Sequence, residues 1–334
     1  RGGDWSSDVC SSDLYHAMTT DAFVASDMSG PADSVNEKGA LAATDALDSR
    51  TLTPENPEKQ SLASGKAPIR PDPLSPSFQP KEMQKVVQEA ILLAGGAVAI
   101  LLQVANPGVG QGVNEHSNFA YRPVDRLRTT MTYVYCMAFG TVDEKKTIID
   151  MVHRAHAPVQ GATYSADDVH LQLWVASTLY AVGLDITEKV FGKFDDAKAD
   201  EIYQEYAVLA TTLRVPPEMW PVDRKAFWEY WDRMIASFEI STHAINVGKD
   251  LLWNKELPLW AKINMPALRL MTAEWLPPRM RDAYGLKTSK TRRRAYRVLM
   301  GVTKSVYPQL PMFIRTYPMK YYMKDMRRRM KNMA

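Results

Sequence analysis

The chain has 334 residues, of which 46% are hydrophobic and 24% are charged, enough for one large domain or two ordinary ones around a sizeable core. Its two cysteines, Cys10 and Cys136, exclude a disulfide framework and a four-cysteine zinc site. The net charge of +3 conceals an asymmetry, because residues 281–334 hold 15 Lys or Arg against 2 Asp or Glu, and the remaining chain has a balance of −10.

The first 80 residues do not have the pattern of a folded domain. Residues 1–14, RGGDWSSDVCSSDL, resemble a translated sequencing adaptor. We therefore expect them to be non-native, and the native N-terminus, with any anchor it carries, to be missing. Residues 15–80 are rich in Ala, Ser, Asp, Pro and Gly without a sustained apolar period, which predicts a disordered leader. No signal peptide is recognisable.

From residue 81 onward, apolar residues recur at a helical period. The patterns cover 81–105, 124–139, 143–158, 169–182, 195–213, 223–238 and the region 266–272. Asn106-Pro107-Gly108 and Gly140 end two of these helices, and Asp167-Asp168 caps another. Because period-two alternation never persists, the sequence predicts one all-α domain over residues 81–334. No run of 18 uncharged apolar residues occurs, so we expect Ala90–Ala105 to be a core helix rather than a transmembrane one.

Histidines are the first candidates for chemistry, because histidine ligates metals and haem iron. His153 and His156 lie three residues apart and share a helix face. A histidine on a helix is more often a hydrogen-bonded structural residue, but His156 ends its helix just before Pro158, where a side chain can face an adjoining cavity. A competing hypothesis is a di-iron site, because Asp150-x-x-His153 and Asp167-x-x-His170 imitate the carboxylate-x-x-His pairs of di-iron bundles. That site needs two further carboxylates on facing helices.

Arg126 and Thr130 are the second pair of candidates. They lie four residues apart on one face of an otherwise apolar helix. A guanidinium in that position can pair with a cofactor carboxylate such as a haem propionate, or steady bound dioxygen. The alternative is a surface arginine with a capping threonine, and the spacing does not decide between them.

Three segments together resemble a known family. They are LLQVANPGVGQGVNEHSNFAYRPVDRLRTTMTYVYCMAFGT, MVHRAHAPVQGATYSADDVHLQLWVASTLY and EYAVLATTLRVPPEMWP, within residues 85–255. This core resembles the catalytic domain shared by bacterial latex-clearing rubber oxygenases and the fungal oxygenase that trims a farnesyl chain in mycophenolic acid biosynthesis. HSNFAYRP and YSADD make the fungal branch look closest.

The resemblance implies a globin-like helical bundle around one haem b, and cleavage of isoprenoid C=C bonds with dioxygen. His156 matches the family's proximal iron ligand, and Arg126 and Thr130 match its active-site arginine and threonine. Two positions depart from the pattern: Thr129 stands where rubber oxygenases carry a lysine, and Asn106 where many relatives have histidine. The first departure puts rubber-like gating of the distal iron face in doubt.

We therefore expect a haem-dependent oxygenase that acts on a hydrophobic isoprenoid-type molecule. The alternatives are another haem oxidation, by a peroxygenase or hydroxylase, and a non-catalytic helical protein on a membrane surface. Candidate pocket residues are Met131, Tyr135, Met137, Leu171 and Trp174, although core packing explains each equally well.

The basic residues 281–334 indicate an anionic partner, and we expect a membrane surface. Arg292–Arg294 and Arg327–Arg329 are the dense clusters, and a solvated helix end is the alternative. Because no nucleic-acid motif accompanies the charge, no nucleic acid is expected. The expected location is intracellular, in the cytoplasm or peripherally on an internal membrane such as the endoplasmic reticulum.

Overall fold

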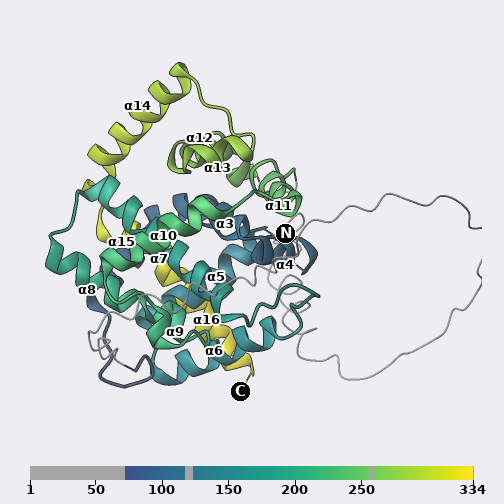
Figure 1. The fold of residues 1–334 in the computed structure, drawn as a ribbon. Coiled ribbons are helices and arrows are strands. Elements are labelled where there is room, and N and C mark those ends of the chain that lie inside the picture. Colours follow the sequence, from purple (N-terminus) through teal and green to yellow (C-terminus); the bar gives the residue numbers. More distant parts are fainter. Residues whose placement is uncertain (1–71, 117–122, 256, 258, 334) are drawn as a thin grey trace, which may run out of the picture.

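The computed structural model describes residues 72–116, 123–255, 257 and 259–333, and these residues form an all-α fold (Figure 1). No β-strand occurs among them, and Gln160 and Ser165 form an isolated β-bridge. The predicted fold class is confirmed. The adaptor-like segment 1–14 and leader residues 15–71 lie outside the described residues. The prediction of a disordered leader up to residue 80 is wrong for residues 72–80, because Leu74 and Phe78 pack against the core.

The first half of the fold has helical structure in each region that the sequence patterns predict, and one additional helix. The elements are α2 (Lys81–Val87), the 3₁₀ turn η2 (Ala90–Gly95), α3 (Gly96–Ala105), α4 (Pro107–His116), α5 (Pro123–Phe139), α6 (Val142–His156) and α7 (Val169–Phe191). The predicted helix 81–105 is divided, because the extended backbone of Glu89 separates α2 from the turn η2 that leads into α3. The additional helix is α4. Asn106 ends α3 and its side-chain oxygen accepts hydrogen bonds from the backbone N–H groups of Gly108 and Val109, at 3.0 and 3.4 Å. The predicted breaker therefore also starts the next helix, with Pro107 at its favoured first position.

The second half is a series of shorter helices. They are α8 (Asp196–Tyr206), α9 (Val208–Thr211), η3 (Pro217–Met219), α10 (Arg224–Ser237), α11 (Thr242–Leu252), α12 (Leu259–Trp275), α13 (Pro278–Ala283), α14 (Lys290–Val306), η4 (Tyr307–Gln309), α15 (Met312–Arg315) and α16 (Tyr317–Met333). Figure 1 shows α12, α13 and α14 together at one end of the molecule, above the bundle that α3, α5 and α7 help to form.

Helix α7 is the central element of the bundle. Asp168 caps its N-terminus by accepting hydrogen bonds from the backbone N–H groups of His170 and Leu171. Gly95 lets η2 approach α7 closely, since a Cβ there would overlap the Ile186 side chain. By length and composition α7 could cross a membrane, and the bent pair Lys81–Val87 and Ala90–Ala105 also passes that test. The sequence patterns did not single out α7; with 61% of its apolar window buried, it has the burial of a core helix.

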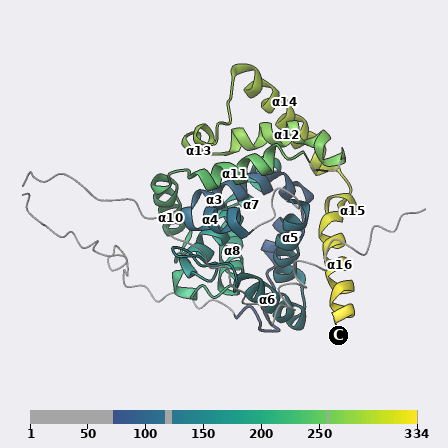
Figure 2. The ribbon, with the colours of Figure 1, turned by 90° about the vertical axis from the view of Figure 1, so that its right-hand side faces the viewer.

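The C-terminal helix α16 returns to the bundle. Figure 2 shows it running along one side of the molecule next to α5, and the two helices are in contact. Asp325 of α16 accepts a hydrogen bond of 3.0 Å from Nε of Arg128 in α5. Arg327 donates to Glu144 of α6 at 2.7 Å. The C-terminal helix of the basic tail is therefore attached to the body of the protein.

Candidate active site

The main cavity has a volume of about 480 Å³ and lies between α4, α5, α6, α7 and α16. This is within the range of small-molecule and cofactor sites, roughly 300–1,000 Å³. Aliphatic side chains such as Val109, Val152, Leu171 and Val175 make up much of its wall, and a few polar groups interrupt them. A wall of this kind suits a flat apolar group that carries a small number of charges.

His156 reaches this wall because α6 ends there. Thr141 and Glu144 form a capping box at the start of α6, and the helix then runs 15 residues to His156. The Nδ1 atom of His156 is buried without a hydrogen-bond partner. Burial lowers the pKa of His156, an effect that the nearby Arg126 reinforces and Asp167 opposes. The imidazole is therefore held in its neutral form, which is the form that ligates metals.

His153, one turn earlier, does not line the main cavity. Its pKa is also lowered, first by burial and then by Arg214. Its Nε2 atom is buried without a hydrogen bond, as is Nδ1 of His156. Contact with the cavity therefore distinguishes the two histidines, and His153 also has a hydrogen bond with the Thr212 backbone.

Arg126 and Thr130 both line the cavity, on the shared face of α5 that the spacing predicts. Arg126 is half-buried on the cavity wall, and burial lowers the pKa of its guanidinium, so this side chain is not the fully exposed arginine of the alternative interpretation. A guanidinium remains charged in a protein, and Arg126 brings a positive charge and several N–H donors to the wall. Thr129 also lines the cavity, where a lysine would stand in rubber oxygenases.

The residues of the di-iron hypothesis are not assembled into a donor cluster. Within the described ranges, no group of three or more His, Cys, Asp or Glu side chains lies close enough to hold a metal ion. Asp150 and His170 are exposed, and Asp167 pairs with Arg214 at 2.9 Å. A haem iron, by contrast, needs a single protein ligand on one side.

A polar network on the cavity wall was not predicted from the sequence. Tyr164 donates a hydrogen bond of 2.6 Å to Glu115, and its hydroxyl lies 2.9 Å from Nε2 of His116. The hydrogen bond with Glu115 raises the pKa of Tyr164 to about 12 and lowers the pKa of Glu115. Tyr164 and His116 line the cavity. Both lie within the quoted family segments, but their pairing across 48 residues has no local sequence signal.

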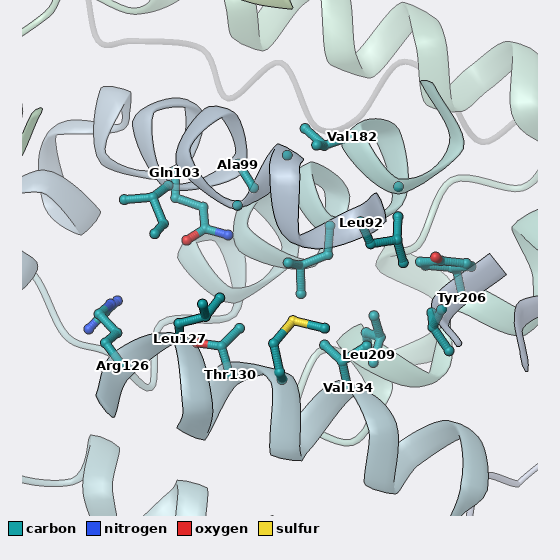
Figure 3. Close-up of a pocket in the computed structure, with 17 residues that line it drawn as sticks. Leu92, Ala99, Gln103, Arg126, Leu127, Thr130, Val134, Val182, Tyr206 and Leu209 are labelled. Atoms are coloured by element: carbon teal, nitrogen blue, oxygen red, sulfur yellow. The ribbon is translucent and has the colours of Figure 1, made fainter. Parts of the chain in front are cut away.

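A second, smaller chamber of about 80 Å³ adjoins the main cavity (Figure 3). The two share the wall residues Gln103, Arg126, Thr130, Leu179 and Leu209. Figure 3 shows Arg126, Thr130 and Val134 projecting from α5, opposite Gln103 and Ala99 of α3.

Three of the five shared wall residues, Gln103, Arg126 and Thr130, are polar and lie toward one end of the chamber. Gln103 there donates to Thr178 at 3.0 Å. Apolar side chains and Tyr206 line the far end.

The pocket residues proposed from the sequence divide into two groups. Met131 lines the chamber and Leu171 lines the main cavity. Tyr135, Met137 and Trp174 line neither space and are fully buried in the core, as the packing alternative holds. An apolar helix has too many inward positions for its pattern to separate cavity wall from core.

Helix α16 completes one side of the main cavity with Asp325, Met326, Arg329 and Met330. Asp325 is only 6% exposed at its side chain and pairs with Arg128, Arg328 and Arg329. Two of these arginines, Arg128 and Arg329, are also on the cavity wall. The wall near α16 therefore carries a surplus of positive charge.

Comparison with known proteins gives the family. Residues 83–305 match the family described as ER-bound oxygenase mpaB/B'/Rubber oxygenase, catalytic domain. An uncharacterized protein of Mycobacterium bovis and one of Mycobacterium tuberculosis are each 35% identical over 249 residues, covering 69% of this chain and 94% of the relative. No solved structure matches.

These relatives are bacterial, so they support the family but not the fungal branch that the sequence motifs favoured. The matched residues run from α2 to α14. They include α5, which carries Arg126 and Thr130, and α6, which carries His156. The chain belongs to the family of mpaB and rubber oxygenase catalytic domains, and it is an oxygenase, an enzyme of the oxidoreductase class.

Proposed function

We propose that this protein is a haem b-dependent oxygenase that cleaves C=C bonds of a prenyl or isoprenoid chain with dioxygen. The observation that carries the proposal is the buried, unpartnered Nδ1 of His156 on the wall of a cofactor-sized cavity. Leaving a buried polar atom without a partner costs about 1–3 kcal/mol. A ligand that binds Nδ1 would remove that cost.

The residues around the cavity fit a haem. His156 would hold the iron through its neutral imidazole, and the aliphatic wall would cover the macrocycle. Haem also carries two propionates, which need cationic partners. Arg126, Arg128 and Arg329 line the same cavity and offer positive charge at its edge. When bound, the haem iron supplies the centre at which dioxygen is activated.

The chamber supports an apolar chain as substrate. Cavities with apolar walls stay dry and take up apolar ligands, because water finds no hydrogen-bond partners there. Along most of its length the chamber offers only aliphatic surface, from residues such as Leu92, Ala99, Val134 and Val182. A branched hydrocarbon chain would lie in the chamber. It would exclude water from the part that Arg126 and Thr130 line, where the chamber meets the main cavity.

The overall reaction balances without an outside reductant. One alkene and one dioxygen give two carbonyl ends, so the C=C bond breaks and each carbon receives one oxygen atom. The protein's side chains would orient the alkene and exclude water. Arg126 and Thr130 would donate hydrogen bonds to polar groups beside the alkene. We further propose an intracellular setting at an internal membrane, because such chains partition into bilayers and the matched family description includes ER-bound oxygenases.

The test is expression with a haem precursor, followed by absorption spectroscopy and product analysis. The proposal expects a Soret band, and two carbonyl fragments from a farnesyl-chain substrate under dioxygen. A product that keeps the intact carbon skeleton and gains a hydroxyl would instead support a hydroxylase or peroxygenase. Protein that never takes up haem would refute the cofactor and leave the family assignment standing.

A further inference from the structure

Solvent-exposed apolar side chains are concentrated in one short part of the described chain. Eight of the thirteen large exposed hydrophobic residues fall between residues 298 and 321. On α14 they form a row at i, i+4 and i+8: Val298, Val302 and Val306 are 67%, 57% and 52% exposed. The opposite face of α14 packs through Tyr296, Leu299 and Met300 on the protein. The valine row therefore lies on the outer face of the helix.

Helix α15 turns its charged side chain toward the protein and its apolar side chains toward solvent. Arg315 points inward, with 16% of its side chain exposed, and pairs with buried Glu89 at 3.4 Å. Met312, Phe313 and Ile314 are exposed, Phe313 by 66%. Tyr307, between the two helices, donates to Glu89 at 2.9 Å. The segment is thus attached to the body through its polar groups and presents its apolar groups outward.

Basic side chains accompany the valine row. By helix periodicity Arg293, Arg294, Arg297 and Lys304 lie along one side of it, and all are exposed. Arg292, Arg293 and Arg294 also occupy the first turn of α14, where the helix dipole disfavours positive charge and no acidic residue is present. This arrangement weakens the isolated helix and suits an anionic partner.

The two basic clusters of the sequence therefore differ in the structure. Arg327, Arg328 and Arg329 on α16 pair with Glu144 or Asp325. The structure assigns no ion pair to Arg293, Arg294 or Arg297 among the residues that it describes. Of the two clusters, the one without ion pairs to described residues lies on α14, next to the exposed valines.

We propose that the outer faces of α14 and α15 bind the surface of an anionic lipid bilayer. Aliphatic and aromatic groups interleaved with arginine and lysine are typical of helices that lie in the plane of a membrane interface. The apolar row would enter the boundary between headgroups and acyl chains, and the arginines would contact lipid phosphates. Nucleic acid would engage the arginines but leave Val298, Val302 and Phe313 facing water. The inference does not depend on haem or on catalysis.

The experiment is flotation of the full chain with vesicles of phosphatidylcholine alone, and with vesicles that contain about one-third phosphatidylserine. We expect the protein to float with the anionic vesicles only, and less at high salt. Each basic residue near such a surface contributes roughly a fivefold factor. The triple variant R293Q/R294Q/R297Q should therefore lose at least tenfold in binding, and V298S/V302S and F313S should also lose binding.

Matched controls separate the face from general charge and hydrophobicity. K81Q/K146Q/K225Q removes the same charge from exposed positions elsewhere, and V222S removes an exposed valine from the α10 side. Both should bind like the parent protein. Equal losses in the controls, or no flotation of the parent protein, would overturn the proposal. It would also be overturned if the parent bound RNA tightly and R293Q/R294Q/R297Q lost that binding while V298S/V302S kept it, or if V298S/V302S dissociated a stable dimer.

Discussion

Filling the chamber should change stability and activity in opposite directions. Ala99 lines the chamber from α3, and Ala99→Leu places three more carbon atoms in it. At about 24 cal/mol per Å³ of unfilled volume, the 80 Å³ chamber costs the empty protein about 2 kcal/mol. We expect Ala99→Leu to recover part of this, raising the free energy of unfolding by about 1 kcal/mol.

The control is the same substitution two residues earlier. Ala97 is buried in the core between α3 and its neighbours, and it lines neither space. A leucine there overpacks the core and should lower the free energy of unfolding by roughly 1–3 kcal/mol. Urea unfolding of the haem-free proteins measures both changes, provided that the slope with urea concentration stays the same.

Activity completes the test. If the chamber receives the substrate chain, Ala99→Leu should reduce turnover of a farnesyl-chain substrate at least tenfold, while haem content stays normal. Destabilisation as large as that of Ala97→Leu would show that the chamber cannot accept added atoms. Stabilisation with unchanged turnover would show that the substrate lies elsewhere, and the proposed role of the chamber would be wrong.

Three further predictions concern the main cavity and the attachment of α16 to α6. His156→Ala should abolish the Soret band and His153→Ala should keep it, since only His156 lines the cavity; normal haem content in the first variant would refute the assignment. Arg126→Ala should lower haem retention or turnover at least tenfold, equivalent to about 1.4 kcal/mol, and an unchanged rate would exclude a role in the site. The third concerns Glu144, whose pKa the hydrogen bond from Arg327 lowers below its ordinary 4.5. As the pH falls, Glu144 is protonated in the unfolded chain before it is protonated in the folded protein. The stabilisation from the Glu144–Arg327 pair is therefore complete above pH 4.5 and declines below it. Glu144→Gln should flatten that decline in thermal unfolding, whereas an identical pH profile would show that the pair contributes nothing.

Helix limits could be predicted where the sequence contains residues that cap or end helices. Gly140 and Thr141 separate α5 from α6, and Asp168 caps α7, so these boundaries agree with the structure to within about two residues. The α3–α4 boundary was only half predicted. Asn106-Pro107-Gly108 is both a stop and a start, and the decisive contact is the Asn106 side chain on the next helix's backbone.

The candidate site could be predicted only as far as one helix determines it. Helix spacing places Arg126 and Thr130 on one face, and the end of α6 places His156 at a boundary. The chamber has no such signal, because Leu92, Ala99, Val134 and Val182 meet there from separate elements. The wall of a cavity depends on which inward side chains fail to touch, and a periodic pattern contains no information about that gap.

The basic tail shows most clearly why a charge count needs the fold. Its 15 basic residues against 2 acidic ones predict a single cationic segment, yet Asp325 alone pairs with Arg128 of α5 and with Arg328 and Arg329. A buried carboxylate needs such compensation, and its own helix and α5 both supply it. Consequently α16 becomes part of the cavity wall, although it lies beyond the matched residues 83–305. The remaining positive charge is concentrated on α14, so one tail forms both a wall of the candidate site and the surface that we expect to meet lipid.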